Sequence, residues 1–183
     1  VGTQTLDAPV SGGDKGAKEG TLAIMVGGDP AAYDTVRPLF DILGGNVALM
    51  GPHGAGQHTK MCNQILVAGT MAGVCESLLY AERQGLDMEA IIAIIGKGAA
   101  GSWAINNIGP RIARADYAPG FYVEHFVKDM DIALRECATA TLALPGLALV
   151  HQLYTAVKAE GFHRDGTQAL MKALRRLNGL DAS

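Results

Sequence analysis

The stretch that decides the fold is QHTKMCNQILVAGTMAGVCESLLYAERQ, which covers residues 57–84. It contains no proline, so it predicts one long helix of roughly 42 Å at about 1.5 Å per residue. Near its middle lies a stripe of small residues, Ala68, Gly69, Ala72 and Gly73. Small residues at this spacing share a helix face and let a second helix approach closely. We therefore expect this helix to be mostly buried.

The chain after this helix also carries helical signals. Asp87 is a good N-cap residue, and the apolar residues that follow it predict a helix. Residues 117–120, Tyr-Ala-Pro-Gly, predict a loop. The expected helices run from Met88 to about Ile95, from Ser102 to about Ala115, from Val123 to Ala140, from Pro145 to about Glu160 and from Gly166 to Leu177. Residues 53–183 are thus predicted to form an all-helical domain.

The chain before the long helix has an α/β pattern. Residues 21–26 form an apolar run bounded by glycines, which is typical of a buried strand. Asp29 and Pro30 predict the start of a helix that ends near residue 43, and residues 46–50 predict another strand. The fold class is therefore mostly α, with residues 1–52 as a small α/β remnant. Two or three strands are too few for a doubly wound sheet, so we expect a missing part upstream.

Composition argues against several classes of protein. The chain has 183 residues, with 15 Lys and Arg against 18 Asp and Glu and a net charge of −3. This weakly acidic balance argues against a nucleic-acid binder. No apolar run approaches the roughly 20 residues needed to cross a bilayer, and no secretory signal is visible. We expect a cytoplasmic protein that binds neither nucleic acid nor membrane.

Cysteine and histidine usage gives no sign of a metal site. The chain has three cysteines, whose spacing fits no zinc pattern: Cys62, Cys75 and Cys137. We interpret them as buried, reduced thiols. The five histidines also lack a metal-binding spacing: His53, His58, His125, His151 and His163.

Two clusters, one directly after a predicted strand and one at the start of the long helix, could carry chemistry. The first is Ser11-Gly12-Gly13-Asp14-Lys15-Gly16-Ala17, where N–H groups and a hydroxyl could bind a carboxylate, although a tight glycine turn is the simpler interpretation. In the second, Lys60, Asn63 and Gln64 stand at i, i+3 and i+4 and share one helix face. That face is either a solvated polar surface or a general acid/base site.

Three further features have a simple interpretation. Lys128 and Asp129 are adjacent in a predicted helix, which favours a structural salt bridge. Gly54-Ala55-Gly56 is not a dinucleotide fingerprint, because position 59 is threonine, and we find no pyrophosphate-binding loop in the chain. Trp103, the only tryptophan, is expected in the core, with a place beside a substrate pocket as the alternative.

Taken together, four stretches make the chain resemble the β-hydroxyacid dehydrogenases, a family that includes 3-hydroxyisobutyrate dehydrogenase and tartronate semialdehyde reductase. These stretches are DAPVSGGDKGAKEGTLAIMVGG, GPHGAGQHTKMCNQ, GAAGS at residues 98–102 and FVKDMDIAL. They follow the family order, and the resemblance covers nearly all of the chain. It implies a helical domain of the 6-phosphogluconate dehydrogenase-like type. It also implies an oxidoreductase that moves a hydride between NAD or NADP and the β-hydroxyl carbon of a small hydroxycarboxylic acid.

The resemblance implies roles on the substrate side. Lys60 would be the general acid/base, and one lysine can serve in both directions if desolvation and a neighbouring cation lower its pKa toward neutrality. One amide that follows Lys60 by a helical turn would contact the substrate, and we slightly favour Asn63 over Gln64. The residues that would hold the substrate carboxylate are Ser11, Gly12 and Gly13.

The resemblance also implies roles on the cofactor side. Lys128 would contact the nicotinamide end of the cofactor, and Phe121 and Asp129 match positions near it. Members of the family carry an N-terminal Rossmann domain with the glycine-rich fingerprint, and this chain begins after it. We therefore expect the chain by itself to bind NAD or NADP weakly and to be inactive. The family further implies a homodimer or homotetramer formed through the helical domain.

Other interpretations stay open on the sequence alone. A non-catalytic oligomerisation or binding module of the same fold would have lost the lysine, and imine reductases usually carry another residue there. A free-standing helical protein without a cofactor is the third interpretation. The presence of Lys60 favours the enzyme. The sequence decides neither the hydroxyacid nor the choice between NAD and NADP.

Overall fold

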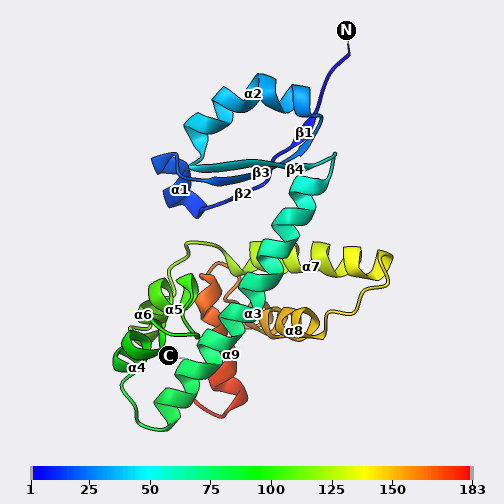
Figure 1. Cartoon of the computed structure of the whole chain (residues 1–183). Coiled ribbons are helices and arrows are strands. Elements are labelled where there is room, and N and C mark those ends of the chain that lie inside the picture. Colours follow the sequence, from blue (N-terminus) through cyan, green and yellow to red (C-terminus); the bar gives the residue numbers. More distant parts are fainter. Residues whose placement is uncertain (1, 182–183) are drawn as a thin grey trace. The chain divides into compact units, whose positions relative to one another are not determined.

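The computed structural model describes residues 2–181, and its contacts divide the chain into two compact units. Unit 1 is Val1–Asn63 and unit 2 is Gln64–Ser183. Figure 1 shows the elements of both units. The division falls inside one helix, α3 (Ala55–Arg83), which contributes its first residues to unit 1 and the rest to unit 2. The expected domain boundary after residue 52 stays a prediction.

Unit 1 is built on a small mixed sheet with β3 in its middle. The strands β1 and β2 pair antiparallel with β3 and continue one register, in which Asp7 faces Gly27 and Ser11 faces Ala23. The strand β4 pairs with β3 in parallel. The elements before α3 are β1 (Leu6–Asp7), β2 (Val10–Ser11), α1 (Gly13–Glu19), β3 (Ala23–Gly28), α2 (Pro30–Leu43) and β4 (Asn46–Gly51).

The core of unit 1 lies between β3 and α2. Its buried side chains are Leu22, Ile24, Val26 and Tyr33, with Phe40 and Leu49 packed against them. The expected helix is present, since α2 begins at Pro30 and the carboxylate of Asp29 accepts a hydrogen bond from the N–H of Ala32 at 2.9 Å. The two strands expected on either side of this helix are also present as β3 and β4.

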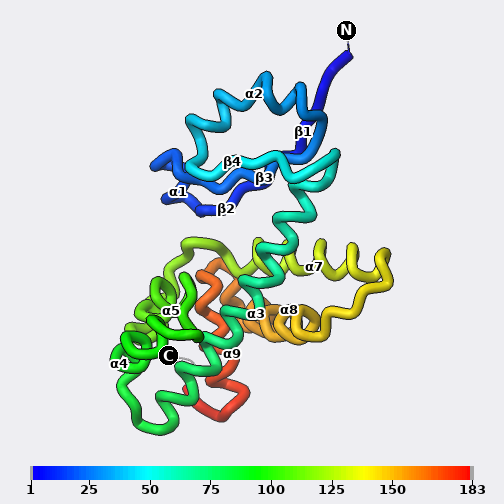
Figure 2. The backbone as a smooth tube through the Cα atoms, viewed as in Figure 1, coloured from blue at the N-terminus to red at the C-terminus, as the bar shows by residue number. Residues whose placement is uncertain are grey.

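Unit 2 is predominantly helical. Its elements after α3 are α4 (Met88–Ile95), α5 (Trp103–Asn107), α6 (Gly109–Ala113), α7 (Val123–Thr139), α8 (Pro145–Ala159), the 3-10 turn η1 (Thr167–Ala169) and α9 (Leu170–Leu177). The short helices α4, α5 and α6 pack on one another, and α8 packs on both α7 and α9 (Figure 2). The helical part also contains one isolated antiparallel bridge, between Tyr122 and Gly166.

One predicted helix is divided in the structure. The segment expected to run unbroken from Ser102 to about Ala115 forms α5 and α6, separated at Ile108. The reason is Pro110, which has no N–H to donate to the carbonyl of Asn106. Ser102 does start the first of the two helices, and its hydroxyl accepts a hydrogen bond from the N–H of Ile105 at 3.1 Å.

The long helix buries only one side. Ala68 and Ala72 lie in the core of unit 2, as expected, but Gly69 and Gly73 are exposed, and a Cβ added at either glycine would meet nothing within 4 Å. Within the single chain, the small-residue stripe is therefore covered at its alanines and open at its glycines. Among the described residues, α3 is the one helix long and apolar enough to cross a membrane by length and composition. Half of that window is buried in the structure, and core helices of water-soluble proteins meet the same criterion.

Two predictions of burial fail for single side chains. Cys75 and Cys137 are buried as expected, but Cys62 is exposed. Trp103 was expected in the core, and it is 71% exposed at the first position of α5. Both residues lie on the outer side of a helix, and the sequence around them does not show which side that is.

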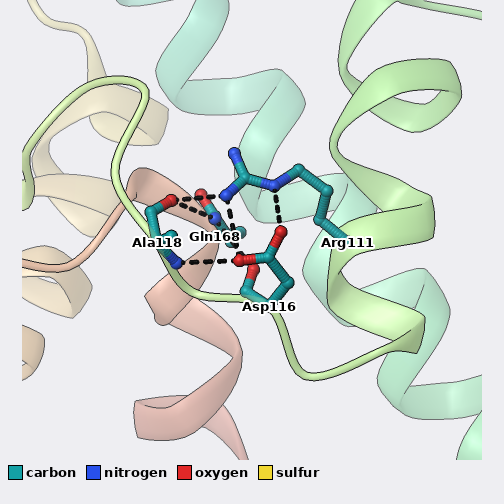
Figure 3. Close-up of polar contacts among 4 residues, drawn as sticks. All are labelled: Arg111, Asp116, Ala118 and Gln168. Atoms are coloured by element: carbon teal, nitrogen blue, oxygen red, sulfur yellow. Dashed lines mark hydrogen bonds and ion pairs between the residues drawn. The ribbon is translucent and has the colours of Figure 1, made fainter.

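A polar network holds the loop that connects α6 to α7 (Figure 3). The guanidinium of Arg111 donates to both carboxylate oxygens of Asp116, at 2.8 Å and 3.1 Å. The same carboxylate accepts a bond from the N–H of Ala118, and the buried Gln168 donates to the carbonyls of Asp116 and Ala118. These bonds pair the carbonyls of Asp116 and Ala118 and the N–H of Ala118, which ties this part of the loop to α6 and η1.

Asp116 should make the stability of the protein depend on pH in acid. The hydrogen bonds from Arg111 and Ala118 lower the pKa of this carboxyl from 3.8 to about 2. The ionised carboxylate therefore stabilises the folded state above pH 3.8, and this contribution is lost as the pH falls through about 2. We expect Asp116→Asn to lower the melting temperature at pH 7, and the difference from the wild type to shrink between pH 3.8 and pH 2.

The measurement is thermal unfolding followed by circular dichroism across this pH range. The matched control is Asp34→Asn, which changes an exposed aspartate on α2. A difference between Asp116→Asn and the wild type that does not change with pH would contradict the role given to the ionised carboxylate.

Candidate active site

Unit 1 brings together the predicted carboxylate-binding serine and the predicted acid/base lysine. Ser11 ends β2, where strand pairing with Ala23 fixes its backbone. Lys60 lies in the second turn of α3, and its Nζ donates to the Ser11 Oγ at 2.9 Å. Both side chains are partly buried, and the pair is separated by 49 residues in sequence. The contact joins the first two motifs of the sequence analysis.

The two glycines after Ser11 have conformations that favour glycine. Gly12 has a φ of 132° and Gly13 has a φ of 62°. A Cβ on Gly12 would lie 3.1 Å from the Cδ2 of Leu22. The chain then enters α1 at Gly13, so the interpretation of this cluster as a simple tight turn is wrong. Both glycines are exposed, which leaves their backbone accessible to a ligand.

Unit 2 brings together three further predicted residues. Gln64 is buried in α3, and its Nε2 donates to the Oδ2 of Asp129 at 2.6 Å. The other carboxylate oxygen of Asp129 lies 2.7 Å from the Nζ of Lys128. The Asp129 side chain is 8% exposed and that of Lys128 is 62% exposed. The salt bridge expected between these neighbours is thus present, and it joins a buried carboxylate to an ammonium group that faces solvent.

The last two candidates from the sequence are Phe121 and Asn63. Phe121 stands two residues before the start of α7, and its ring makes edge-on contacts with the rings of Phe126 and His125. It is 37% exposed, so part of the ring is open to a ligand. Asn63 is half-buried and directly precedes Gln64 in α3.

A glycine spacing that the sequence analysis passed over can be judged from the structure. Gly96-Lys97-Gly98-Ala99-Ala100-Gly101 fits the letters G-x-G-x-x-G, but it follows the helix α4 and not a strand. The N–H groups of Gly96, Gly98 and Gly101 donate to carbonyls of Ile92, Ile95 and Gly98. These groups are therefore used within the loop and do not form a pyrophosphate cradle.

Neither the buried thiol of Cys75 nor any group of metal-binding side chains in the described chain gives a second candidate site. Burial raises the pKa of the Cys75 thiol to about 12, which makes it an unreactive thiol. Among residues 2–181, no group of three His, Cys, Asp or Glu side chains lies close enough to hold a metal ion.

Family comparisons account for nearly the whole chain. Residues 54–174 match the family described as "NAD-binding of NADP-dependent 3-hydroxyisobutyrate dehydrogenase". Residues 1–51 match the "NAD binding domain of 6-phosphogluconate dehydrogenase". The chain belongs to the β-hydroxyacid dehydrogenase family. This confirms the resemblance found in the four sequence stretches, and both descriptions name a nicotinamide cofactor.

Individual relatives agree with this assignment. The chain is 52% identical over 176 residues to probable 3-hydroxyisobutyrate dehydrogenase-like 1, mitochondrial, of Arabidopsis thaliana, covering 96% of this chain and 52% of the relative. It is 40% identical over 174 residues to 2-hydroxy-3-oxopropionate reductase of Escherichia coli, covering 95% and 60%. The solved structure of Mycobacterium tuberculosis 3-hydroxyisobutyrate dehydrogenase with L-serine has a TM-score of 0.85 at 32% identity, covering 93% of this chain and 60% of that one. The chain thus spans about half to three-fifths of the length of these relatives.

One residue beside the site was missed by the sequence analysis. Asp7 in β1 accepts hydrogen bonds from the N–H groups of Gly54 and Gln57, at the start of the helix that carries Lys60. A signal was present in the sequence, because Gly54-Ala55-Gly56 opens a long helix without a side chain able to cap it. It did not show which distant residue supplies the cap.

The buried bond between Gln64 and Asp129 should stabilise unit 2. We expect Gln64→Ala to lower the free energy of unfolding by about 1–3 kcal/mol, because the buried carboxylate loses a hydrogen-bond donor. Lys128→Ala should cost about 0–1 kcal/mol, because the lysine side chain is largely in solvent. The measurement is urea denaturation of both variants.

The matched control is Gln84→Ala, which makes the same substitution at an exposed glutamine just after α3. If Gln64→Ala were no more destabilising than Gln84→Ala, the bond to Asp129 would have no measurable part in stability.

Proposed function

We propose that this chain carries the substrate-binding and acid/base part of an NAD- or NADP-dependent β-hydroxyacid dehydrogenase. The substrate would be a small carboxylic acid with a hydroxyl on its β-carbon, and that carbon would exchange a hydride with the cofactor. The names of the relatives, which refer to 3-hydroxyisobutyrate and 2-hydroxy-3-oxopropionate, support this substrate class. The single observation that carries the proposal is the 2.9 Å bond between the Lys60 Nζ and the Ser11 Oγ.

The contact suits this class of substrate. In a β-hydroxyacid, one carbon separates the carboxylate from the carbon that bears the hydroxyl. A site for it needs carboxylate donors directly beside a proton donor and acceptor. The Ser11 hydroxyl accepts from Lys60 and still has its own proton to donate to a carboxylate. The exposed backbone of Gly12 and Gly13 adjoins this hydroxyl and adds candidate N–H donors.

Lys60 would move the proton of the reaction. In the direction of oxidation, its neutral amine takes the proton from the substrate hydroxyl as the hydride leaves the β-carbon that bears this hydroxyl. In the direction of reduction, its ammonium group gives a proton to the carbonyl oxygen. When bound, NAD or NADP supplies or accepts the hydride, and the protein residues orient the substrate and handle the proton.

The residues of unit 2 fit a role toward the cofactor. Lys128 presents a solvent-facing ammonium group that the buried Asp129 holds from one side. The partly open ring of Phe121 offers an aromatic edge to a planar ligand. The Nε2 of Gln64 donates to Asp129, and we keep Asn63 as the proposed amide that contacts substrate. That the chain by itself binds NAD or NADP weakly stays a prediction.

The alternative is a non-catalytic module of the same family. Such a protein would keep the packing of unit 2, and it would have no need for an amine held against the hydroxyl of Ser11. The contact between Lys60 and Ser11 therefore favours the enzyme over this alternative.

The test of the acid/base role is Lys60→Ala in the complete gene product. We expect kcat to fall by about 10²-fold or more, because no other group replaces the proton donor and acceptor. The assay follows the absorbance of NADH or NADPH with glycerate, 3-hydroxyisobutyrate, 3-hydroxypropionate and serine. The same assay on the 183-residue chain tests the expectation that it is inactive by itself.

The control variant is Lys97→Ala, at an exposed lysine between α4 and α5, which should keep the wild-type rate. If one substrate turns over and Lys60→Ala keeps its rate, Lys60 is not the acid/base. If no substrate turns over with either cofactor, the non-catalytic module becomes the better interpretation.

We also propose that the protein forms a homodimer through unit 2. The outer face of α3 carries Leu66 and Tyr80, which are 72% and 66% exposed, with the open surfaces of Gly69 and Gly73 between them. Large apolar side chains on both sides of two glycines suit close contact with a second helix.

Leu66→Glu should weaken this dimer, because a charge would be buried in an apolar contact. Size-exclusion chromatography with light scattering measures the mass, which should fall toward that of a monomer. The control is Leu177→Glu, at a leucine of similar exposure on α9, which should not change the mass. A monomeric wild type would overturn the proposal.

A further inference from the structure

The helix α3 begins without a cap of its own. Gly54, which precedes its first residue, has no side chain, and Ala55 and Gly56 follow. The first N–H groups of a helix have no partner within the helix and need one from elsewhere. The N–H of Ala55 donates to the carbonyl of Pro52 at 3.0 Å. The neighbouring N–H groups depend on a residue far away in the sequence.

Asp7 supplies the missing cap from the sheet. Its Oδ1 accepts from the N–H of Gly54 at 2.7 Å and its Oδ2 accepts from the N–H of Gln57 at 2.9 Å. Burial alone would raise the pKa of Asp7, but these backbone hydrogen bonds outweigh it and lower the pKa below its usual value. A carboxylate at a helix N-terminus is also favoured by the helix dipole.

Two glycines make room for this contact. A Cβ on Gly27 of β3 would lie 2.5 Å from one carboxylate oxygen of Asp7 and 2.8 Å from the backbone nitrogen of Gly56. A Cβ on Gly56 would meet the carbonyl oxygen of Met25. The helix start therefore lies against the strands at a distance that only glycine permits, and the carboxylate fills the space between them.

The cap and the candidate catalytic contact join the same helix to β1 and β2, two strands that pair with β3 in one register. Asp7 and Ser11 belong to one register along β3, four residues apart. Gln57 and Lys60 lie three residues apart on α3, and positions at this spacing lie on neighbouring turns of one helix face. The bond from Gln57 to Asp7 and the bond from Lys60 to Ser11 are thus two successive hydrogen bonds from α3, the first to β1 and the second to β2. The donor of the first bond is a backbone N–H of the helix, whereas the donor of the second is the end of a flexible lysine side chain.

We propose that Asp7 is a positioning residue for Lys60: its carboxylate holds the first turn of α3 against the sheet and so keeps the lysine amine beside Ser11. The expected effect of Asp7 on catalysis rests on the proposed function of Lys60 as the acid/base. Asp7 itself does not touch the reacting atoms. Without the cap, the first turn of α3 loses its link to β1, and the amine of Lys60 loses its fixed distance from the serine.

The experiment compares Asp7→Ala with a matched cap variant, Asp29→Ala, in the complete gene product. Asp29 caps α2 in the same unit and lies outside the proposed machinery. We expect Asp7→Ala to lower kcat by about 10- to 100-fold, since small misplacements of a catalytic group have effects of this size. Asp29→Ala should keep kcat. Asp7→Asn keeps one acceptor oxygen, so its kcat should lie between those of the wild type and Asp7→Ala. This variant replaces Asp7→Ala in the comparison if Asp7→Ala does not fold.

A second readout does not depend on activity. The rate at which an amine-reactive ester labels Lys60, relative to Lys97, is measured by mass spectrometry. We expect labelling of Lys60 to rise several-fold in Asp7→Ala and to stay at the wild-type rate in Asp29→Ala. Equal losses of kcat in the two variants would show that Asp7 acts only through general stability, and unchanged labelling in Asp7→Ala would also overturn the proposal. If the wild type turns over no substrate but the labelling changes as expected, the proposed function fails while the positioning of Lys60 by Asp7 stands.

Discussion

The burial of one face of α3 is the constraint on which the rest of unit 2 depends. Ala68, Met71, Cys75 and Leu78 on this face are almost fully buried. Because protein interiors are closely packed, a helix of this length held along one face has little freedom to rotate about its axis. The rotation places Gln64 in the interior, where its amide must find a partner, and Asp129 is that partner. The packing of α3 thereby links the core of unit 2 to the polar groups proposed to face the cofactor.

The first two turns of the same helix lie in unit 1 and carry Lys60, the proposed acid/base. A lysine side chain has a flexible four-carbon stem, so an amine in solvent would sample many positions. Here β1 supplies a cap for the helix start and β2 supplies a hydroxyl for the amine, so the amine is positioned when the protein folds. An acid/base group that is already placed loses less entropy in the reaction than one that must be captured. Gly27 and Gly56 permit this close approach of helix and strands, because a Cβ at either position would clash with neighbouring atoms.

Local signals in the sequence predicted much of the fold. Asp29 with Pro30, Asp87 and Ser102 each mark the start of a helix, because a cap acts within three residues of chain. The four sequence stretches likewise led to the family and to the candidates Ser11, Lys60 and Lys128, whose contacts the structure now describes. The predictions that were wrong concern how a segment folds or which side of a helix is covered. The glycine cluster after Ser11 enters a helix, Pro110 divides a helix in two, and Trp103 and Cys62 face outward.

The sequence by itself thus determined the order of the elements, most of their ends, the family and the residue types available for proton transfer. These properties depend on neighbours within a few positions, or on motifs that stand in a fixed order along the chain. Only the tertiary structure decided which side of each helix is covered, and which distant polar groups meet: Lys60 with Ser11, Gln64 with Asp129, and Asp7 with the start of α3. Contacts across 47 to 65 residues arise from packing of separate elements, and no local pattern in the chain encodes such a distance.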